Sequence, residues 1–396
     1  MKKRNNISWN SGMKKTVIIP AILIILNSAL LSQEEKPKFF ELNGYLTTMQ
    51  SAMFDSISGP FVFDNLIHNR LNLKGYVNDH ITLAVELRNR LFTGDMARTG
   101  NIYSEMIGTD PGWIDMSWNL VTKNSFFFNT TIDRLWLDLN FEKIQVRVGR
   151  QRINWGQTFV WNPNDVFNAY SFFDFDYIER PGSDAVRIQY YPTSSSAVEL
   201  AAKIDSEDDV TAAGLYRFNK WGYDFQVLAG YSNSSDILAG AGWSGAIGSL
   251  SFRGEGTWFR PLENFSDTAG TTIITAGIDK IFDDNSMVQA QVMYCNNPLE
   301  LTDFTSFYNG NLSAKDLSFS KFSAFGQFTW AANPLLNIGI SAMWLPDLKG
   351  YFTGPSLDYS IAENLDFSLI WQHFNSMMGS TRTRINLAFL RIKFSF

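Results

Sequence analysis

The sequence predicts an all-β fold, an antiparallel up-and-down β-barrel that crosses a membrane with about eighteen strands, sixteen being the alternative count. Three observations indicate this fold class. After Lys38 the hydrophobicity alternates with a period of two residues rather than 3.6. The chain is 45% hydrophobic and 15% aromatic, yet only its N-terminus holds a continuous apolar run. The connections between the alternating segments form a short set and a long set, as in membrane-spanning barrels.

The N-terminal segment has the order of a secretory signal peptide. Basic residues precede the apolar run 17–31, and polar residues follow it abruptly. The run is short for a helix that crosses a bilayer, so a retained anchor is the less favoured interpretation. We therefore expect residues 1–32 to be a signal peptide, with translation starting at Met1 or Met13. Residues 33–396 are expected to form a single barrel domain.

The alternating segments give the expected strands in chain order. In the clearest of them, residues 135–141, apolar side chains suited to lipid alternate with Trp and polar side chains on the opposite face. The predicted strands cover residues 39–53, 66–77, 80–92, 130–141, 144–152, 184–192, 196–204, 208–218, 222–232, 236–246, 249–260, 271–282, 286–296, 317–331, 335–345, 351–362, 364–375 and 382–396.

The connections between these strands support the even count. Short turns rich in turn-forming residues fall near 78–79, 142–143, 193–195, 219–221, 247–248, 283–285, 332–334 and 363. The long connections, 93–129, 153–183 and 297–316, all belong to the other set. Because outer-membrane barrels place short turns in the periplasm and long loops outside, both termini are expected to be periplasmic.

Composition and charge exclude several classes of protein. A single cysteine, Cys295, allows neither an intrachain disulfide nor a thiolate metal cage, and we expect no metal and no cofactor. Without residues 1–32, 28 basic side chains remain against 39 acidic ones, a formal balance of −11. Such a chain has no electrostatic reason to bind nucleic acid. An exported, aromatic-rich chain without helical spans is typical of a protein embedded in the lipid of a bacterial outer membrane.

The last predicted strand alternates apolar and basic residues up to the terminal Phe396. A final strand that closes with Phe is similar to the signal by which the barrel assembly machinery recognises its clients. An ordinary amphipathic strand that ends in Phe is the alternative interpretation.

The predicted loop 153–183 and its flanks carry the most specific motifs. They read GRQ at Gly149–Gln151, WG at Trp155–Gly156, WNPND at Trp161–Asp165 and ERPGSDAVR at Glu179–Arg187. These motifs resemble those of a large group of Gram-negative porins related to the alginate-export porins. The resemblance implies a barrel with a positively charged pore. Alginate exporters are longer than this chain, so their substrate is not carried over.

Basic residues on the predicted strands alternate with lipid-facing apolar residues and therefore share the lumen side. An arginine facing hydrocarbon at mid-depth costs about 2–4 kcal/mol, which enforces this placement. The predicted basic wall consists of Arg70, Lys74, Arg88, Arg90, Arg134, Arg147, Arg187, Arg391 and Lys393. The first and last strands become neighbours on closure, so these residues are expected to lie on one side of the pore.

Opposite charges come from the predicted loop, which we expect to fold into the lumen as a constriction. Its candidate residues are Trp155, Trp161, Asp165, Asp174, Asp176, Glu179 and Asp184. An acidic surface set against a basic wall would create a transverse field that orders small polar or anionic solutes. Two alternatives stay open: the charges pair and fill the lumen, or the loop folds outward as an extracellular lid.

The predicted function is passive diffusion of small solutes, without enzymatic activity, and a homotrimer is one oligomeric state to be tested. Two further classes compete with it. A non-conducting recognition barrel would hold a partner through residues 93–129. An outer-membrane hydrolase would need an acid beside His373 and Ser376, and the spacing identifies none.

Overall fold

The structure, a computed structural model, describes residues 39–396 except 174–176, 178, 264 and 301–312. The expected signal peptide lies outside the described residues. No helix in the described part of the chain is long and apolar enough to cross a membrane.

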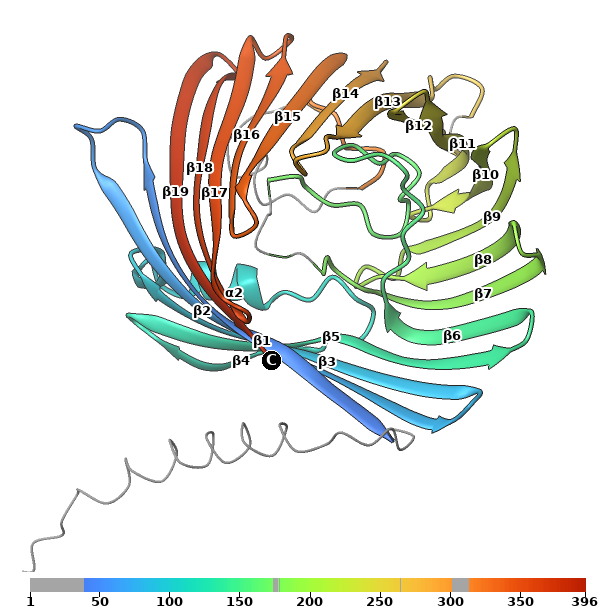
Figure 1. The fold of residues 1–396 in the computed structure, drawn as a ribbon, viewed down its shortest axis with the longest axis horizontal. Helices are drawn as coiled ribbons and strands as arrows, with labels where there is room; N and C mark the ends of the chain where they lie inside the picture. The colour runs from blue at the N-terminus through green and yellow to red at the C-terminus, as the bar shows by residue number, and fades with distance from the viewer. Residues whose placement is uncertain (1–38, 174–176, 178, 264, 301–312) are drawn as a thin grey trace, which may run out of the picture. The chain divides into compact units, whose positions relative to one another are not determined.

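Eighteen strands of the described chain form one closed antiparallel sheet in which each strand pairs with the next along the chain (Figure 1). Strand β1 (Phe40–Phe54) pairs with both β2 (Phe61–Asn78) and β19 (Thr381–Ser395), and this closes the barrel. The predicted all-β up-and-down barrel of about eighteen strands is therefore confirmed.

Every predicted strand has a counterpart whose bounds differ by at most five residues. The remaining barrel strands are β3 (Ile81–Gly94), β5 (Phe126–Phe141), β6 (Ile144–Gln151), β7 (Ser183–Thr193), β8 (Ser196–Ile204), β9 (Val210–Lys220), β10 (Tyr223–Ser232), β11 (Asp236–Ile247), β12 (Leu250–Pro261), β13 (Thr271–Ile281), β14 (Met287–Cys295), β15 (Phe322–Asn333), β16 (Leu336–Leu345), β17 (Gly350–Ala362) and β18 (Leu365–Met378).

The predicted loop 93–129 contains structure that the sequence pattern did not indicate. It holds the short helices η1 (Met96–Arg98) and α2 (Asn101–Gly108) and the strand β4 (Ser117–Lys123), which pairs with the first part of β5. A register shift between Asn119 and Val121 breaks the alternation of β4, and six of its seven residues are exposed. Its sequence therefore lacks the period-two signal of a half-buried strand.

The connections divide between the two ends of the barrel as the sequence predicts. One end, here the short-turn end, carries turns such as 142–143 and 221–222, whereas the long-loop end carries 152–182 and 296–321. At 221–222 both residues have positive φ, 56° and 78°, the backbone that a two-residue hairpin requires.

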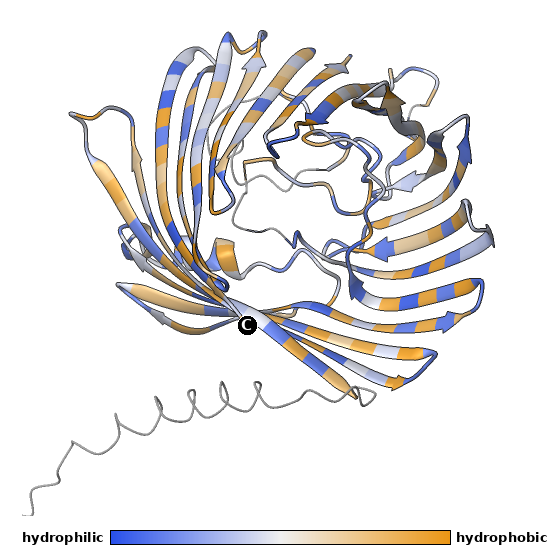
Figure 2. Ribbon diagram, viewed as in Figure 1, coloured by the Kyte–Doolittle hydropathy of each residue, from blue (hydrophilic) through white to orange (hydrophobic). Residues whose placement is uncertain are grey.

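Side chains alternate between the lumen and the outer surface, which Figure 2 shows as alternating hydropathy along the strands. In β7, Val186 and Ile188 are exposed on the outside, while Arg187 and Gln189 reach Glu199 of β8 inside. The apolar surface of the strands thus faces lipid.

The packed core lies inside the barrel, where the connection 152–182 meets inward-facing residues of the wall. Its two main clusters centre on Trp161, Phe173, Phe325, Phe352 and Phe374, and on Ile153, Trp155, Phe167, Leu215 and Phe259.

Candidate functional site

The connection 152–182 enters the lumen (Figure 1). Its described residues contact inward-facing side chains on strands around the circumference. These wall residues include Glu199 on β8, Gln226 on β10, Glu255 on β12, Gln291 on β14 and Gln372 on β18. The geometry thus matches the inward loop that the sequence predicts and not the outward lid.

Polar wall residues supply the hydrogen-bond partners that this irregular backbone lacks. The Glu255 carboxylate accepts from the Gln157 backbone N–H at 2.6 Å and from Thr158 Oγ1 at 3.2 Å. Gln291 Oε1 accepts from the backbone N–H groups of Phe159 and Val160 at 3.1 and 2.9 Å. A segment outside a β-ladder must find such partners when it is buried, so the wall fixes the path of the loop.

The two loop tryptophans singled out in the sequence anchor the loop rather than face open space. Trp155 is fully buried, and its indole N–H donates to the Glu199 carboxylate. Arg187 donates to the same carboxylate through Nε and Nη2 at 2.8 Å. Trp161 is buried in the cluster that contains Phe173. Trp155 thus attaches the loop to β8 through a hydrogen bond to Glu199, and Trp161 attaches it to a separate apolar cluster.

Arg70 of β2 is the centre of a buried charge cluster on the wall formed by β2, β3 and β5. Its guanidinium pairs with Asp133 and Glu86, and Glu179 Oε1 of the loop lies 3.9 Å from its Nε. The Tyr177 hydroxyl also donates to Asp133. The cluster therefore neutralises Arg70 and holds the loop residue Glu179 in place.

Other arginines of the predicted basic wall have equally specific partners. Arg134 donates to the carbonyl oxygens of Glu179 and Arg180 at 2.8 and 2.5 Å, and Arg147 pairs with Asp138 at 2.8 Å. Much of the wall charge is thus compensated by wall acids, as the pairing alternative proposes.

The predicted loop acid Asp184 belongs to the wall. It lies in β7, directly opposite Arg150 of β6, and the two side chains pair at 2.7 Å. Arg150 is buried, and its guanidinium donates to Asp184, Asp110 and the Ile114 carbonyl oxygen. Gly149, the residue before it, has φ of 114°. A Cβ at Gly149 would lie 2.2 Å from the Leu135 carbonyl oxygen, so glycine is required there.

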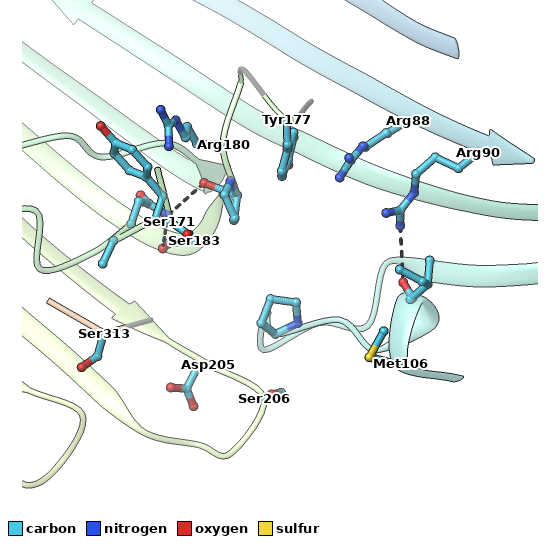
Figure 3. Close-up of a pocket in the computed structure, with 18 of the residues that line it drawn as sticks. Arg88, Arg90, Met106, Ser171, Tyr177, Arg180, Ser183, Asp205, Ser206 and Ser313 are labelled. Carbon is cyan, nitrogen blue, oxygen red and sulfur yellow. Dashed lines mark hydrogen bonds between the residues drawn. The ribbon is translucent and has the colours of Figure 1, made fainter. Parts of the chain in front are cut away.

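A cavity of about 840 Å³ remains between the loop and the long-loop end. Figure 3 shows Arg88, Arg90 and Arg180 along one side of it and Asp205 on the other. The titratable residues that line it are Asp64, Arg88, Arg90, Tyr103, Tyr170, Tyr177, Arg180, Asp184, Lys203, Asp205, Glu207 and Asp209. Basic and acidic groups thus face one another across this cavity.

Aromatic rings of the loop hold two of the cavity arginines. The Arg88 guanidinium lies 3.8 Å from the centre of the Tyr177 ring, and Arg180 lies 3.0 Å from that of Tyr170. Arg90 donates to the neutral oxygens of Asn129 and Ile107 at 2.7 and 3.3 Å. Since Arg90 forms no ion pair among the described residues, its charge acts on the cavity.

Asp165 of the loop is fully buried. Its Oδ1 accepts from the Trp155 backbone N–H at 3.5 Å, while its Oδ2 has no hydrogen-bond partner among the described residues. Burial raises the pKa of Asp165 to about 6, against the opposing effect of Arg152.

Comparisons with known proteins identify the fold of the chain but assign it to no sequence family. No family model and no curated protein matches the chain. Solved structures match over its length: OccK11 (OpdR) of Pseudomonas aeruginosa at 8% identity, covering 90% of this chain and 96% of that one, with a TM-score of 0.58. OccAB3 of Acinetobacter baumannii matches at 11% identity, covering 90% and 99%, also with a TM-score of 0.58. These proteins are outer-membrane porins.

The chain has the fold of an outer-membrane porin. At these identities the likeness is one of fold alone, and at that level it confirms the predicted resemblance to Gram-negative porins. The porin fold also supports the bacterial outer membrane as the location.

The remaining predicted site residues lie in the following places. Lys74 points inward near the short-turn end, Arg391 donates to Ser368 Oγ at 3.2 Å, and Lys393 Nζ lies 4.3 Å from the centre of the Tyr45 ring. Phe396 exchanges two backbone hydrogen bonds of 2.9 Å with Gly44. Asp174 and Asp176 lie outside the described residues.

The acids that face the cavity from the connection between β8 and β9 are not indicated by the sequence pattern. Asp205, Glu207 and Asp209 line it. Their acidic run is visible in the sequence, but an acidic turn is usually solvated, and nothing in the chain order places it opposite Arg88. For the hydrolase alternative, the partner of the His373 ring Nδ1 is the Asn386 amide oxygen at 2.8 Å, not a carboxylate.

Proposed function

We propose that this chain is a porin that lets small polar or anionic solutes diffuse passively across the outer membrane, past a loop that narrows the lumen. The observation that carries the proposal is the 840 Å³ cavity, which has arginines on one side and carboxylates on the other. A low-dielectric wall strengthens the field between them. A solute with negative charge or a large dipole would be oriented as it passes.

The two kinds of wall arginine have different roles in this proposal. Arg70, Arg134 and Arg187, paired with acids or loop carbonyls, keep the loop at a fixed position. Arg88 and Arg90 face the cavity and attract the solute. The acidic side is formed by Asp184 and the 205–209 connection, whereas the loop residue Glu179 belongs to the Arg70 cluster.

The proposed orientation places both termini and the short-turn end in the periplasm and the long-loop end outside. This follows the loop lengths found in outer-membrane barrels. Phe396, which pairs with Gly44 at the barrel seam, would then present the last strand to the barrel assembly machinery from the periplasmic side.

Conductance of the purified chain in a planar lipid bilayer tests the proposal. We expect stable current steps and, in a salt gradient, a reversal potential that shows a preference for anions. The double substitution Arg88→Ser and Arg90→Ser should move that potential towards zero, because it removes the charge that faces the cavity. Arg98→Ser, which removes an exposed arginine outside the cavity, should leave the potential unchanged. A correctly folded barrel without current would overturn the porin proposal.

One observation favours a second candidate, a barrel that binds a partner through its long loops. Ile102 and Trp113 at the long-loop end are 77% and 56% exposed, and Leu120 on β4 is 60% exposed. Exposed apolar residues of this kind mark interaction sites when they gather on one surface. The same bilayer measurement separates the two candidates, since a recognition barrel with a blocked lumen carries no current.

A further inference from the structure

An apolar groove of about 610 Å³ lies on the outer surface of the barrel, over the seam between β1 and β19. Its floor contains two small residues, Ala52 of β1 and Ala388 of β19, which lie directly opposite each other. Phe63 of β2 and Trp371 of β18 are the next residues in the same row and form its walls. Two alanines between two aromatic rings leave a groove that runs along the strands.

The outward face of β19 changes from apolar to basic just above the groove. Leu387 and Phe389 are buried in the interior cluster, so the alternate residues of β19 point outward. From the groove towards the long-loop end these are Ala388, Asn386, Arg384 and Arg382. Trp371, which is 46% exposed, lies at the level of this change, as tryptophans do at a membrane surface. The groove therefore lies in the apolar band and its upper end at the boundary with water.

Asn386 organises the polar groups at this boundary. Its Nδ2 donates to the carbonyl oxygens of Phe54 and Asp55 at 3.2 Å. Its Oδ1 accepts from Trp371 Nε1 at 3.3 Å and from His373 Nδ1 at 2.8 Å. The other ring nitrogen of His373, Nε2, has no hydrogen-bond partner among the described residues. The imidazole is thus held at the outer surface with one nitrogen available to a ligand.

Two arginines lie above this imidazole without a counter-charge. Arg382 and Arg384 are exposed and form no ion pair among the described residues. Arg382 Nη1 donates to the carbonyl oxygen of Lys349, which adds a third exposed cation. Arg384 and His373 occupy diagonal positions on β19 and β18, about 7–8 Å apart, within reach of a long side chain. These groups can therefore converge on one anion.

A buried acceptor adds a second signal beside Arg384. Asn375 lies directly opposite Arg384 and is only 7% exposed. Its Nδ2 donates to the Tyr351 hydroxyl at 3.3 Å, whereas its Oδ1 has no hydrogen-bond partner in the described part of the chain. Buried acceptors are normally paired, and a sugar hydroxyl is a donor that this one can use.

We propose that this face binds one phosphorylated glycolipid of the outer leaflet. An acyl chain lies in the groove between Phe63 and Trp371, and the headgroup phosphates pair with Arg382 and Arg384, since guanidinium groups match phosphate oxygens in pairs. Several cations within reach of one headgroup favour a lipid with two phosphates over one with a single phosphodiester. The inference rests on the orientation proposed above, with the long-loop end outside, and not on conduction through the lumen.

Native mass spectrometry of the purified full chain in mild detergent tests the headgroup contact, with diphosphoryl lipid A as the probe. The parent should retain one molecule. Arg382→Ser with Arg384→Ser should raise its dissociation constant about tenfold or more, because two charge-assisted contacts are lost. Arg98→Ser with Lys123→Ser removes two exposed charges elsewhere at the same end and should bind like the parent. A parent that retains no lipid A, or equal binding by the two double variants, would overturn the proposal.

Filling the groove tests the acyl-chain contact without changing any charge. Ala388→Phe should weaken lipid A binding by a similar factor, whereas Ala276→Phe, on the outward face of β13, should have no effect. Heat-modifiable gel migration checks that each variant is folded. Unchanged binding by Ala388→Phe, or displacement of the lipid by glucose 1-phosphate, would overturn the role of the groove. Phosphatidylglycerol should bind more weakly, and equal binding would overturn the choice of lipid.

Cysteine labelling separates this inference from the proposed orientation. Thr381, the first residue of β19, is exposed, and the native Cys295 is fully buried. A membrane-impermeant maleimide should label Thr381→Cys in intact cells. Labelling only after the outer membrane is opened would overturn the assignment to the outer leaflet. Bilayer conductance tests diffusion independently of both results.

Discussion

At the scale of single residues, the lumen depends on buried ion pairs whose members come from different strands. Arg70 has no exposed surface and contacts Asp133 and Glu86. Arg70→Met should lower the free energy of unfolding by about 3–5 kcal/mol, because it leaves buried carboxylates without a counter-charge. Urea denaturation followed by tryptophan fluorescence measures this. Arg98→Met, at an exposed pair, should cost less than about 1 kcal/mol; equal losses would contradict the role of Arg70.

Asp165 should make the stability depend on pH in the direction opposite to that of a paired acid. Its folded pKa, about 6, lies above the usual value of an aspartate. The folded state therefore binds the extra proton, and stability is lost as the pH rises from about 4 to 6. Asp165→Asn removes this effect. The free energy of unfolding of the variant minus that of the parent should therefore be about 3 kcal/mol larger at pH 7.5 than at pH 4. A pH-independent difference in urea denaturation would show that Asp165 titrates normally.

The residue scale is also where prediction from sequence reached its limit. Alternation identified Arg88 and Arg90 as inward-facing, and the structure places both at the cavity. It could not identify their surroundings, because the acids opposite them in the 205–209 connection are more than a hundred positions away in the chain. Pairing of Arg70 with Asp133 is equally invisible, since the bulge in β5 moves Asp133 out of the alternation that the sequence shows.

At the scale of elements, β6 depends on one glycine whose backbone conformation other residues rarely adopt. Gly149→Ala should destabilise the barrel by about 1–3 kcal/mol or more, because the backbone there has φ of 114° and the new Cβ would meet the Leu135 carbonyl. Gly326→Ala in β15, where a Cβ meets nothing within 4 Å, is the matched control. The midpoint of thermal or urea denaturation measures both, and a Gly149→Ala barrel as stable as the control would contradict this account.

Strands were predictable because each has one face towards lipid and one towards the lumen, so apolar and polar residues alternate along its sequence. The exception, β4, has both faces largely exposed, so no such pattern exists to be detected. The path of 152–182 was predictable only in its general direction. Its aromatic residues required burial, but the partners Glu255 and Gln291 lie on strands about a hundred residues further along the chain.

At the scale of the whole molecule, the length of the connections determined the topology. Alternate connections are short, which leaves an antiparallel ring as the simplest arrangement, and the register of β1 with β19 completes it. Net charge was a poor guide at this scale. The chain has a negative net charge, yet individual ion pairs and a few cavity-facing arginines determine the electrostatics of its interior. The net charge gives no sign of these arginines.

The attachment of the loop on both sides of the seam between β1 and β19 has a mechanical consequence. Phe173 packs against Phe352 and Phe374 on one side of that seam, while Tyr177 is bonded to Asp133 on the other. The loop therefore acts as an internal brace behind the seam. Separating β1 from β19 would also break either the ring contacts of Phe173 or the hydrogen bond from Tyr177 to Asp133. The loop therefore opposes lateral opening of the barrel.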